Sequence, residues 1–322
     1  MNDSKISRLR KLLENTLLPL IDSDYVLWEV PHYTNVGDIL IWEGERQLLH
    51  KSRHKCIGVA SMHTCSFPTL SADTVILLQG GGNFGDLWRE IQLFRMEVVK
   101  RYPLNKIVIF PQSVHYDDCE LMRQDAATMS LHNKLTICAR DSLSYELLRE
   151  NFKNDILLLP DMAFCMDIDN LQKDILSSGK LLLLKRVDKE SVPLPPEMEN
   201  MPSLDVEDWP SIHHPTLLLR LLCGTISLHC HLIFYRLSTG WIRSVINRLA
   251  NDYLRPILLR QGVEFMGQYD KIYTTRLHVM ILAVLMNKRV WFIDNSYGKL
   301  SSYYETWLKD IDQVKPYLTE KV

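Results

Sequence analysis

Short apolar runs alternating with helical stretches between Tyr25 and Phe164 constrain the fold of this chain most strongly. Each run is rich in Val, Ile and Leu and is bounded by turn residues, as buried strands are. Strands separated by helices form a parallel sheet that helices cover on both faces. The expected strands are residues 26–30, 56–60, 74–79, 106–110, 135–139 and 156–159, and the expected helices are residues 39–50, 87–100, 119–131 and 142–151.

A second alternating set begins at Lys180, with expected strands at residues 180–185, 271–274 and 290–294 and a helix at 277–287. A chain of 322 residues exceeds what one hydrophobic core usually organises. We therefore predict an α/β fold with two domains, residues 1–170 and 171–322. Residues 299–318 are predicted to be helical and to dock back on the first domain.

Two segments are predicted separately from these sheets. Residues 191–210 contain five prolines and should form an irregular loop. Residues 215–260 are predicted to be largely helical. The stretch 215–241 is the least polar, but Arg220, His229, His231 and Arg236 interrupt it, so a clean bilayer span is absent. A helix lying on a lipid surface stays open as an alternative for this stretch, and so does peripheral membrane contact.

Charge and cysteine content exclude several classes of protein. The chain carries 37 Lys and Arg against 39 Asp and Glu, a formal charge of −2, which gives no long-range attraction to nucleic acid. Its seven cysteines are scattered without a CxxC pair, which favours reduced thiols in a cytoplasmic enzyme. His229, Cys230 and His231 are adjacent in sequence and cannot all converge on one ion from a regular element, so we predict no metal.

The glycine-rich segment after residues 74–79 satisfies a GxGxxG pattern at Gly80, Gly82 and Gly85. A dinucleotide site also needs an acid at the end of the next strand, and residues 109–113 contain none. We therefore expect no nicotinamide or flavin cofactor, and instead a backbone cradle for a phosphate, carboxylate or sugar. A tight turn without a ligand is the alternative. The candidate residues here are Gly80, Gly81, Gly82, Asn83 and Asp86.

The segment after residues 26–30 gathers polar side chains before a helix. Asn35 or Asp38 can cap that helix, but His32 and Tyr33 add hydrogen-bonding groups that a cap does not require. The segment could therefore bind a polyhydroxylated ligand. Arg140 and Asp141 open a later helix, where a structural role is the better interpretation because an aspartate in the first turn complements the helix dipole.

The sequence TTRLH at residues 274–278 carries the strongest signal. Arg276 and His278 lie at the start of an apolar helix, where cations are disfavoured unless an anion is bound. Arg186 is a second arginine just past a predicted strand, although Asp188 and Glu190 could neutralise it. The alternative is that Arg276 pairs with a carboxylate of the neighbouring domain and that His278 is a buried imidazole.

Seven motifs together resemble the polysaccharide pyruvyl transferases over residues 26–305. They are NVGD (35–38), QGGGNFGD (79–86), ARDSLS (139–144), LPDMAF (159–164), RVDKE (186–190), TTRLH (274–278) and IDNSYGKL (293–300). The resemblance implies two Rossmann-like domains facing a cleft in a GT-B-like architecture. It also implies phosphoenolpyruvate as the donor and, as the acceptor, a sugar of an envelope glycan or exopolysaccharide or of its lipid-linked precursor. Residues 191–241 match nothing in this pattern.

The resemblance assigns donor binding to Arg186, Arg276, Leu277 and His278, and cleft lining to the glycine and NVGD segments, with Gly37 included. Ketal formation requires protonation of the enol phosphate, and histidine is the side chain whose ordinary pKa suits that task. Arg186 and Arg276 would balance the charges of the donor. Base assistance is left open among Asp38, Asp86 and Asp161. A sugar-nucleotide glycosyltransferase and a non-catalytic glycan-binding protein are the alternatives.

Overall fold

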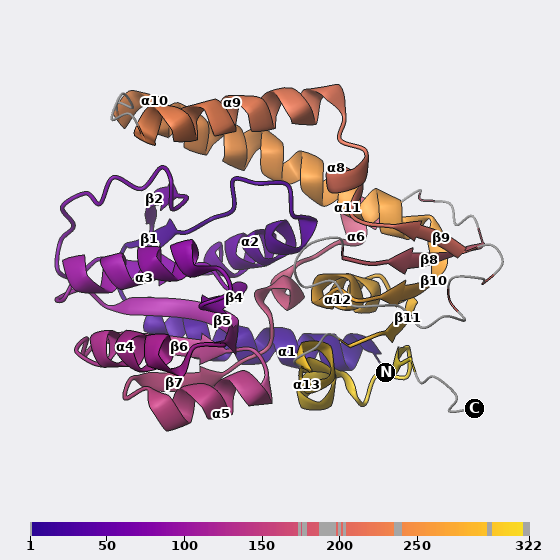
Figure 1. The fold of residues 1–322 in the computed structure, drawn as a ribbon, viewed down its shortest axis with the longest axis horizontal. Helices are drawn as coiled ribbons and strands as arrows, with labels where there is room; N and C mark the ends of the chain where they lie inside the picture. The colour runs from indigo at the N-terminus through magenta and orange to yellow at the C-terminus, as the bar shows by residue number, and fades with distance from the viewer. Residues whose placement is uncertain are drawn as a thin grey trace.

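The computed structural model describes residues 2–172, 179–186, 204–234, 240–294 and 298–317, together with residues 175, 198 and 201. In this part of the chain, parallel strands form two separate sheets with helices packed around them (Figure 1). The prediction of a mixed α/β fold with parallel sheets is confirmed.

The first sheet has the strand order β2-β1-β3-β5-β6-β7, and β4 pairs with β5 beside this path. Its strands are β1 (Tyr25–Trp28), β2 (Cys56–Ala60), β3 (Val75–Leu78), β4 (Gly81–Gly85), β5 (Ile107–His115), β6 (Leu135–Ala139) and β7 (Asp155–Leu158). The helices of this half are α1 (Asn2–Leu17), α2 (Val36–Leu49), α3 (Arg89–Arg101), α4 (Cys119–Met129) and α5 (Ser142–Asn151).

Successive residues of the central strands pack on opposite faces of the first sheet, because side chains alternate along a strand. Leu27 of β1 belongs to a buried cluster with Leu13 of α1 and Trp42 of α2. Val26 belongs to a second cluster with residues of α3, α4 and α5, such as Val98. Both faces of these strands are therefore buried, which explains why they appear as continuous apolar runs in the sequence.

The second sheet has the order β12-β11-β10-β8-β9. Its strands are β8 (Lys180–Leu184), β9 (Leu204–Glu207), β10 (Tyr269–Thr274), β11 (Arg289–Phe292) and β12 (Val314–Pro316). The helical segments of this half are α8 (Pro210–His213), α9 (Leu217–Phe234), α10 (Gly240–Leu249), η3 (Ala250–Leu254), α11 (Arg255–Gly267), α12 (Leu277–Leu285), α13 (Lys299–Tyr303) and η4 (Tyr304–Leu308). Two short elements, η2 (Met162–Cys165) and α6 (Asp169–Gln172), precede β8.

Two expectations about the second half were wrong in part. Strand β9 lies inside the segment expected to be an irregular loop, and β12 lies inside the segment expected to be a helix. Both are edge strands, where acidic residues and proline are tolerated, so an apolar pattern does not identify them. The residues between 187 and 203, apart from 198 and 201, lie outside the described part of the chain.

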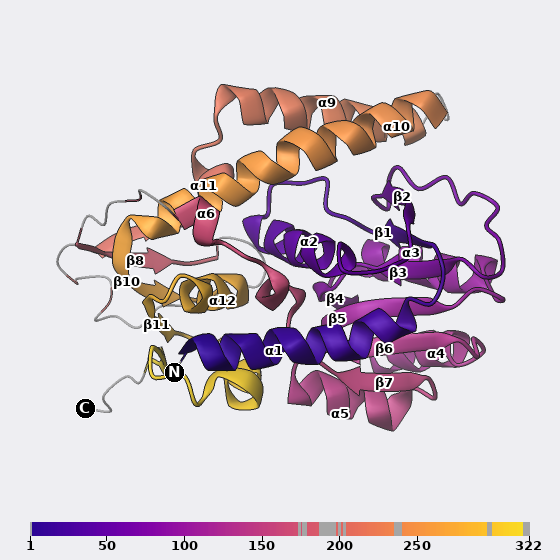
Figure 2. The ribbon, with the colours of Figure 1, turned by 180° about the vertical axis from the view of Figure 1, so that it is seen from behind.

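The C-terminal helical turns contact the first half at the start of α5. The indole Nε1 of Trp307 donates to the carbonyl oxygen of Arg140 at 2.8 Å, and the backbone N–H of Leu143 donates to Ser302 Oγ at 3.3 Å. Tyr303 is fully buried, and its hydroxyl accepts from the N–H of Asp161 at 3.0 Å. Figure 2 shows the same molecule from behind, with α1 crossing both halves. Within the described residues, the helices are too short or too polar to cross a bilayer.

Candidate active site

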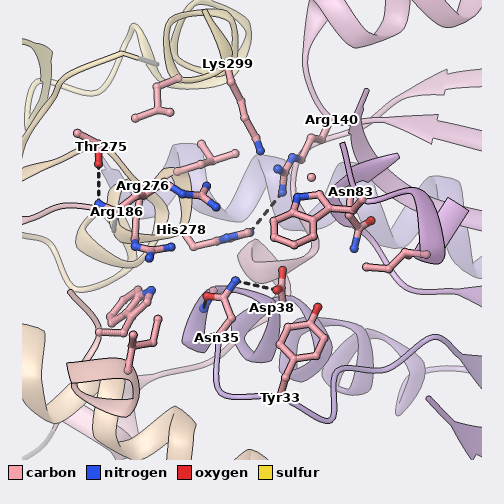
Figure 3. Close-up of a pocket in the computed structure, with 18 residues that line it drawn as sticks. Tyr33, Asn35, Asp38, Asn83, Arg140, Arg186, Thr275, Arg276, His278 and Lys299 are labelled. Carbon is pink, nitrogen blue, oxygen red and sulfur yellow. Dashed lines mark hydrogen bonds between the residues drawn. The ribbon is translucent and has the colours of Figure 1, made fainter. Parts of the chain in front are cut away.

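One cavity of about 290 Å³ lies where residues following strands of both sheets meet (Figure 3). In parallel sheets, ligands bind beyond the carboxyl ends of the strands, as the sequence predicted for this chain. We call it the central cavity. Its lining consists of Tyr33, Asn35, Gly37, Asp38, Gly82, Asn83, Trp88, Ile91, Arg140, Arg186, Trp209, Ile212, Thr275, Arg276, Leu277, His278, Lys299 and Leu300.

His278 is held on one side of the central cavity by two groups from the first half. Its Nε2 lies 3.3 Å from Asp161 Oδ2 and 3.3 Å from Arg140 Nη1. Arg140 Nη1 also donates to Asp161 Oδ2 at 2.8 Å, and Arg140 Nε donates to Ser113 Oγ at 2.9 Å. The imidazole comes from the first turn of α12, in the second half. A buried ion pair of the first half, Arg140 with Asp161, therefore holds it in place.

The carboxylate of Asp161 stays ionised in this network. Burial by itself would raise its pKa, but the charge and hydrogen bond of His278, together with Arg140, hold the pKa well below its ordinary value. Its backbone position is also fixed, since Asp161 Oδ1 accepts from the N–H of Ala163 at 2.9 Å at the start of η2. Asp161 lies behind His278 and outside the cavity lining.

The NVGD segment forms the first turn of α2 and the floor below His278. Asn35 caps the helix, because its Oδ1 accepts from the N–H of Gly37 at 3.0 Å, and its Nδ2 donates to Asp38 Oδ2 at 2.8 Å. Gly37 has no room for a side chain. A Cβ there would lie 2.6 Å from His278 Nδ1. The imidazole thus packs directly on the backbone of this turn.

Two further cations meet over Gly82. A Cβ at this position would lie 2.3 Å from Lys299 Nζ and 2.6 Å from Arg140 Nη2. Lys299 begins α13 and is 8% exposed, and Arg140 follows β6 and is 1% exposed. The glycine therefore permits two buried cations to approach one wall of the central cavity.

Arg276 and Arg186 line the opposite wall. Arg276 Nη2 donates to Asp208 Oδ2 at 2.6 Å, and both side chains are buried. The backbone N–H of Arg186 donates to Thr275 Oγ1 at 3.1 Å. Arg276 precedes α12 and makes no side-chain cap bond, whereas the sequence predicted it within the first turn. The predicted pairing of Arg276 with a carboxylate occurs, with an acid that follows β9 of its own sheet.

The described lining is strongly cationic. It contains the three arginines Arg140, Arg186 and Arg276, the lysine Lys299, and one carboxylate, that of Asp38. The two buried acids behind the lining, Asp161 and Asp208, offset part of this charge. Figure 3 shows the labelled cations directed from both halves toward one space. Such an arrangement suits a small ligand with more than one negative charge.

Most predicted site residues line the central cavity, and four do not, namely Gly80, Gly81, Asp86 and Asp161. Gly80 is buried and donates its N–H to Glu45 Oε1 at 2.8 Å, and Gly81 lies beside it in β4. Asp86 Oδ2 accepts from the N–H groups of Asp117 and Asp118 at 2.8 Å and 2.7 Å, ahead of α4. Gly80 and Asp86 are held by hydrogen bonds within the first half, and the described cavity lining includes neither of them nor Gly81.

The glycine segment itself differs from its expected form. Residues 81–85 form strand β4 rather than a loop that opens a helix, and α3 begins only at Arg89. Gly85 has a φ of 124°, and a Cβ there would lie 1.8 Å from the carbonyl oxygen of His115. The glycines therefore permit close pairing of β4 with β5, and Gly82 and Asn83 alone of this segment reach the described lining.

Arg140, Lys299 and Asp208 were not among the predicted site residues. Arg140 was given a structural role beside the helix cap, and Asp141 does cap α5 by accepting from the N–H of Ser144 at 2.9 Å. A cation directly after a predicted strand was nevertheless a usable signal. Asp208 follows β9, an edge strand without an apolar pattern, and Lys299 begins the short helix α13, so their position at or behind the cavity wall depends on the tertiary fold.

A group near the central cavity could bind a metal ion. Glu207, His213 and His214 place their ligand atoms within 4.8 Å of one another. His213 Nδ1 lies 3.0 Å from Glu207 Oε2, so the group is also explained as an ion pair. It lies outside the lining and supplies nothing to the arrangement described above.

Comparisons with known proteins agree with the sequence motifs. The family model described as polysaccharide pyruvyl transferase matches residues 35–297. The Bacillus subtilis protein named "Putative pyruvyl transferase EpsO" is 30% identical, over 97% of this chain and 95% of its own length. Pyruvyl transferase 1 of Schizosaccharomyces pombe is 27% identical, over 86% of this chain and 68% of its own length. A crystal structure of an uncharacterised Klebsiella pneumoniae protein has the same fold, with a TM-score of 0.65 at 18% identity, covering 97% and 99% of the two chains.

Proposed function

This chain belongs to the polysaccharide pyruvyl transferase family, and from that premise we propose that it transfers pyruvate from phosphoenolpyruvate to two hydroxyls of a sugar. The product would be a cyclic pyruvate ketal on a glycan, with release of inorganic phosphate. The observation that carries the proposal is the central cavity, where Arg140, Arg186, Arg276 and Lys299 surround His278.

The donor has a carboxylate and a phosphate a few bonds apart, and the cations lie on two walls of the cavity. We assign the wall formed by Arg140 and Lys299 to one anionic group, and the wall formed by Arg186 and Arg276 to the other. Guanidinium groups bind both kinds of anion through paired hydrogen bonds, which makes arginine suited to either place. Leu277 contributes backbone at the start of α12.

His278 is proposed as the acid that starts the reaction. Its Nε2 faces Asp161 and Arg140, which leaves Nδ1, above Gly37, to deliver the proton. Protonation of the donor's methylene carbon makes a methyl group and a cationic carbon, which the first sugar hydroxyl attacks. Breaking the bond to phosphate then restores a cationic carbon for the second hydroxyl. One hydroxyl proton replaces the proton given by His278, and the other leaves with phosphate.

Asp38 is the proposed base for the attacking hydroxyl. Of the three acids left open by the sequence, it is the one in the described lining. Asp86 is bound to backbone N–H groups ahead of α4, and Asp161 is buried in contact with Arg140 and His278. Asn35 and Tyr33, beside Asp38, would contact the acceptor sugar.

Other parts of the proposal rest on the family resemblance. The acceptor would be a glycan of the envelope or an exopolysaccharide, or its lipid-linked precursor. The reaction involves no oxidation or reduction that requires a redox cofactor, so we propose that the chain uses no such cofactor. We also propose a cytoplasmic location. We also propose that residues 1–170 and 171–322 act as two domains in a GT-B-like arrangement, with the acceptor bound by the first and the donor bound mainly by the second, to which Arg140 of the first adds one cation.

Titration with candidate donors tests this function directly. We expect phosphoenolpyruvate to raise the melting temperature, because a ligand that binds only the folded state stabilises it. Nucleotide sugars should leave it unchanged. Incubation with phosphoenolpyruvate and a panel of glycan precursors should then yield a product heavier by one pyruvyl ketal in mass spectrometry. Stabilisation by nucleotide sugars alone would favour a glycosyltransferase instead.

Gly37→Ala tests whether His278 must pack on the first turn of α2. The new methyl group would lie 2.6 Å from His278 Nδ1, so the imidazole must move. We expect turnover to fall by about 100-fold, since a displacement of roughly 1 Å at a reacting group can cost that much. Gly240→Ala is the matched control, because a Cβ at Gly240 in α10 meets nothing within 4 Å. Equal turnover for the two variants would contradict the proposed place of His278.

A further inference from the structure

Helices α9 and α10 lie next to each other and form an outer layer of the molecule (Figures 1 and 2). On the inner side of α9, Leu219, Ile226 and His229 are buried, and Ile246 is buried on α10. The outer side of α9 is also apolar. Its leucine row, defined as Leu217, Leu218, Leu221 and Leu228, is 57–74% exposed. Trp241, at the start of α10, is 74% exposed.

The exposed leucines of α9 follow a helical spacing rather than standing singly. Leu217, Leu221 and Leu228 are separated by steps of four and seven residues, so they lie along one side of the helix. Soluble proteins rarely keep a contiguous apolar surface of this kind uncovered, unless it contacts a partner or a membrane.

The charge of the same segment selects the partner. Between Asp208 and Asp252 the sequence contains no Asp or Glu, and it contains four arginines. Arg220 is exposed on α9 and Arg248 is exposed on α10. A helix with leucine and tryptophan on its outer side and arginine beside them is typical of segments that lie in the plane of an anionic membrane surface.

We propose that the leucine row and Trp241 dock this chain on the surface of an anionic phospholipid bilayer. The helices would lie in the interface, with the leucines in the outer acyl region and the arginines among the phosphates. A tryptophan at this depth is favourable, because its ring is apolar and its N–H can reach the headgroups. This inference does not depend on the identity of the donor.

A second copy of the chain is the competing occupant, and charge argues against it. In a two-fold interface the same surface meets itself, so the arginines of one copy would face the arginines of the other. The segment between Asp208 and Asp252 supplies no carboxylate to separate them. A bilayer with anionic headgroups provides the opposite charge that this surface lacks.

The position of the surface relates it to the proposed acceptor. Trp209 and Ile212 line the central cavity, and α9 begins at Leu217, a few residues later. Docking through α9 would therefore place the cavity wall near the membrane. A glycan precursor carried on a lipid would be presented at that surface, which deepens the proposed function where the acceptor is lipid-linked.

Co-sedimentation of the full chain with phospholipid vesicles tests this inference. We expect binding to phosphatidylcholine vesicles that contain phosphatidylglycerol, weaker binding to phosphatidylcholine alone, and release by salt, because exposed charges are screened. Leu221→Glu should weaken binding by about tenfold or more, from the loss of one buried leucine and the added negative charge. Leu131→Glu, at a leucine that is 82% exposed after α4, is the matched control and should bind like the unaltered chain.

Tryptophan fluorescence is a second readout, which tests whether Trp241 enters the bilayer. Brominated lipids should quench the tryptophan fluorescence less in Trp241→Phe than in the unaltered chain. The inference is overturned if the chain does not bind vesicles, or if Leu221→Glu and Leu131→Glu bind equally. It is also overturned if sedimentation velocity shows that Leu221→Glu only separates a dimer. Stabilisation by phosphoenolpyruvate is measured on every variant, so a failure here is distinguishable from failure of the proposed donor.

Discussion

Replacing His278 with alanine is expected to lower turnover by about 100- to 10,000-fold while leaving the fold intact, which is the range that a general acid contributes. The side chain is 12% exposed at the central cavity, and its Nε2 lies 3.3 Å from both Asp161 and Arg140. Alanine removes the proposed proton donor but keeps the apolar helix α12, which is anchored by buried residues such as Met280. The melting temperature should therefore change little.

The assay measures phosphate release and ketal formation with saturating phosphoenolpyruvate. His50→Ala, at an exposed histidine that directly follows α2, is the matched control and should retain full turnover. His278→Ala should still be stabilised by phosphoenolpyruvate, because three arginines and Lys299 remain in the described lining. Full turnover of His278→Ala would remove this residue from the mechanism.

The fall in turnover on the acid side of its pH profile should not come from protonation of Asp161. Its folded-state pKa is held below the ordinary value near 4, mainly by His278 and Arg140 in opposition to burial. The stabilisation that this carboxylate provides is thus present above the unfolded pKa, and is lost only as pH falls through the lower folded value. Across neutral pH, Asp161 stays ionised and keeps His278 in place.

The sequence predicted the mixed α/β class and most of the buried strands, because those strands are apolar on both faces. Strand β6, for example, has the predicted bounds, and all five of its residues are buried. It predicted the NVGD and TTRLH segments as site residues because polar groups directly after such strands must gather at one edge of the sheet. That rule requires no knowledge of how the two halves meet.

What the sequence could not predict depends on contacts between distant segments. Arg276 pairs with Asp208, which lies 68 positions earlier in the sequence. Asp208 directly follows strand β9, and β9 lacks an apolar pattern. The approach of Lys299 to Gly82 requires α13 to pack against the first half. The glycine segment was misassigned, because glycine permits both a phosphate-binding turn and the close backbone approach that pairs β4 with β5.

Arg276→Lys is expected to weaken phosphoenolpyruvate binding by about 10- to 100-fold. Lysine keeps the charge but cannot form the paired hydrogen bonds of a guanidinium, and a hydrogen bond to a charged group contributes about 1.5–3 kcal/mol. In the structure, one guanidinium nitrogen of Arg276 donates to Asp208 at 2.6 Å, while the side chain lines the central cavity. A lysine at this position cannot hold Asp208 and an anionic donor in the same geometry.

Calorimetric titration with phosphoenolpyruvate separates donor binding from structural pairing. Arg289→Lys, at an exposed arginine that begins β11 of the same sheet, is the matched control and should bind the donor like the unaltered chain. Asp208→Asn keeps an acceptor for Arg276 but removes the negative charge, so it should retain donor binding within a few fold. If Arg276→Lys lowered only the melting temperature and left donor affinity unchanged, Arg276 would serve the buried pair alone, and the donor's second anionic group would have to be assigned to Arg186.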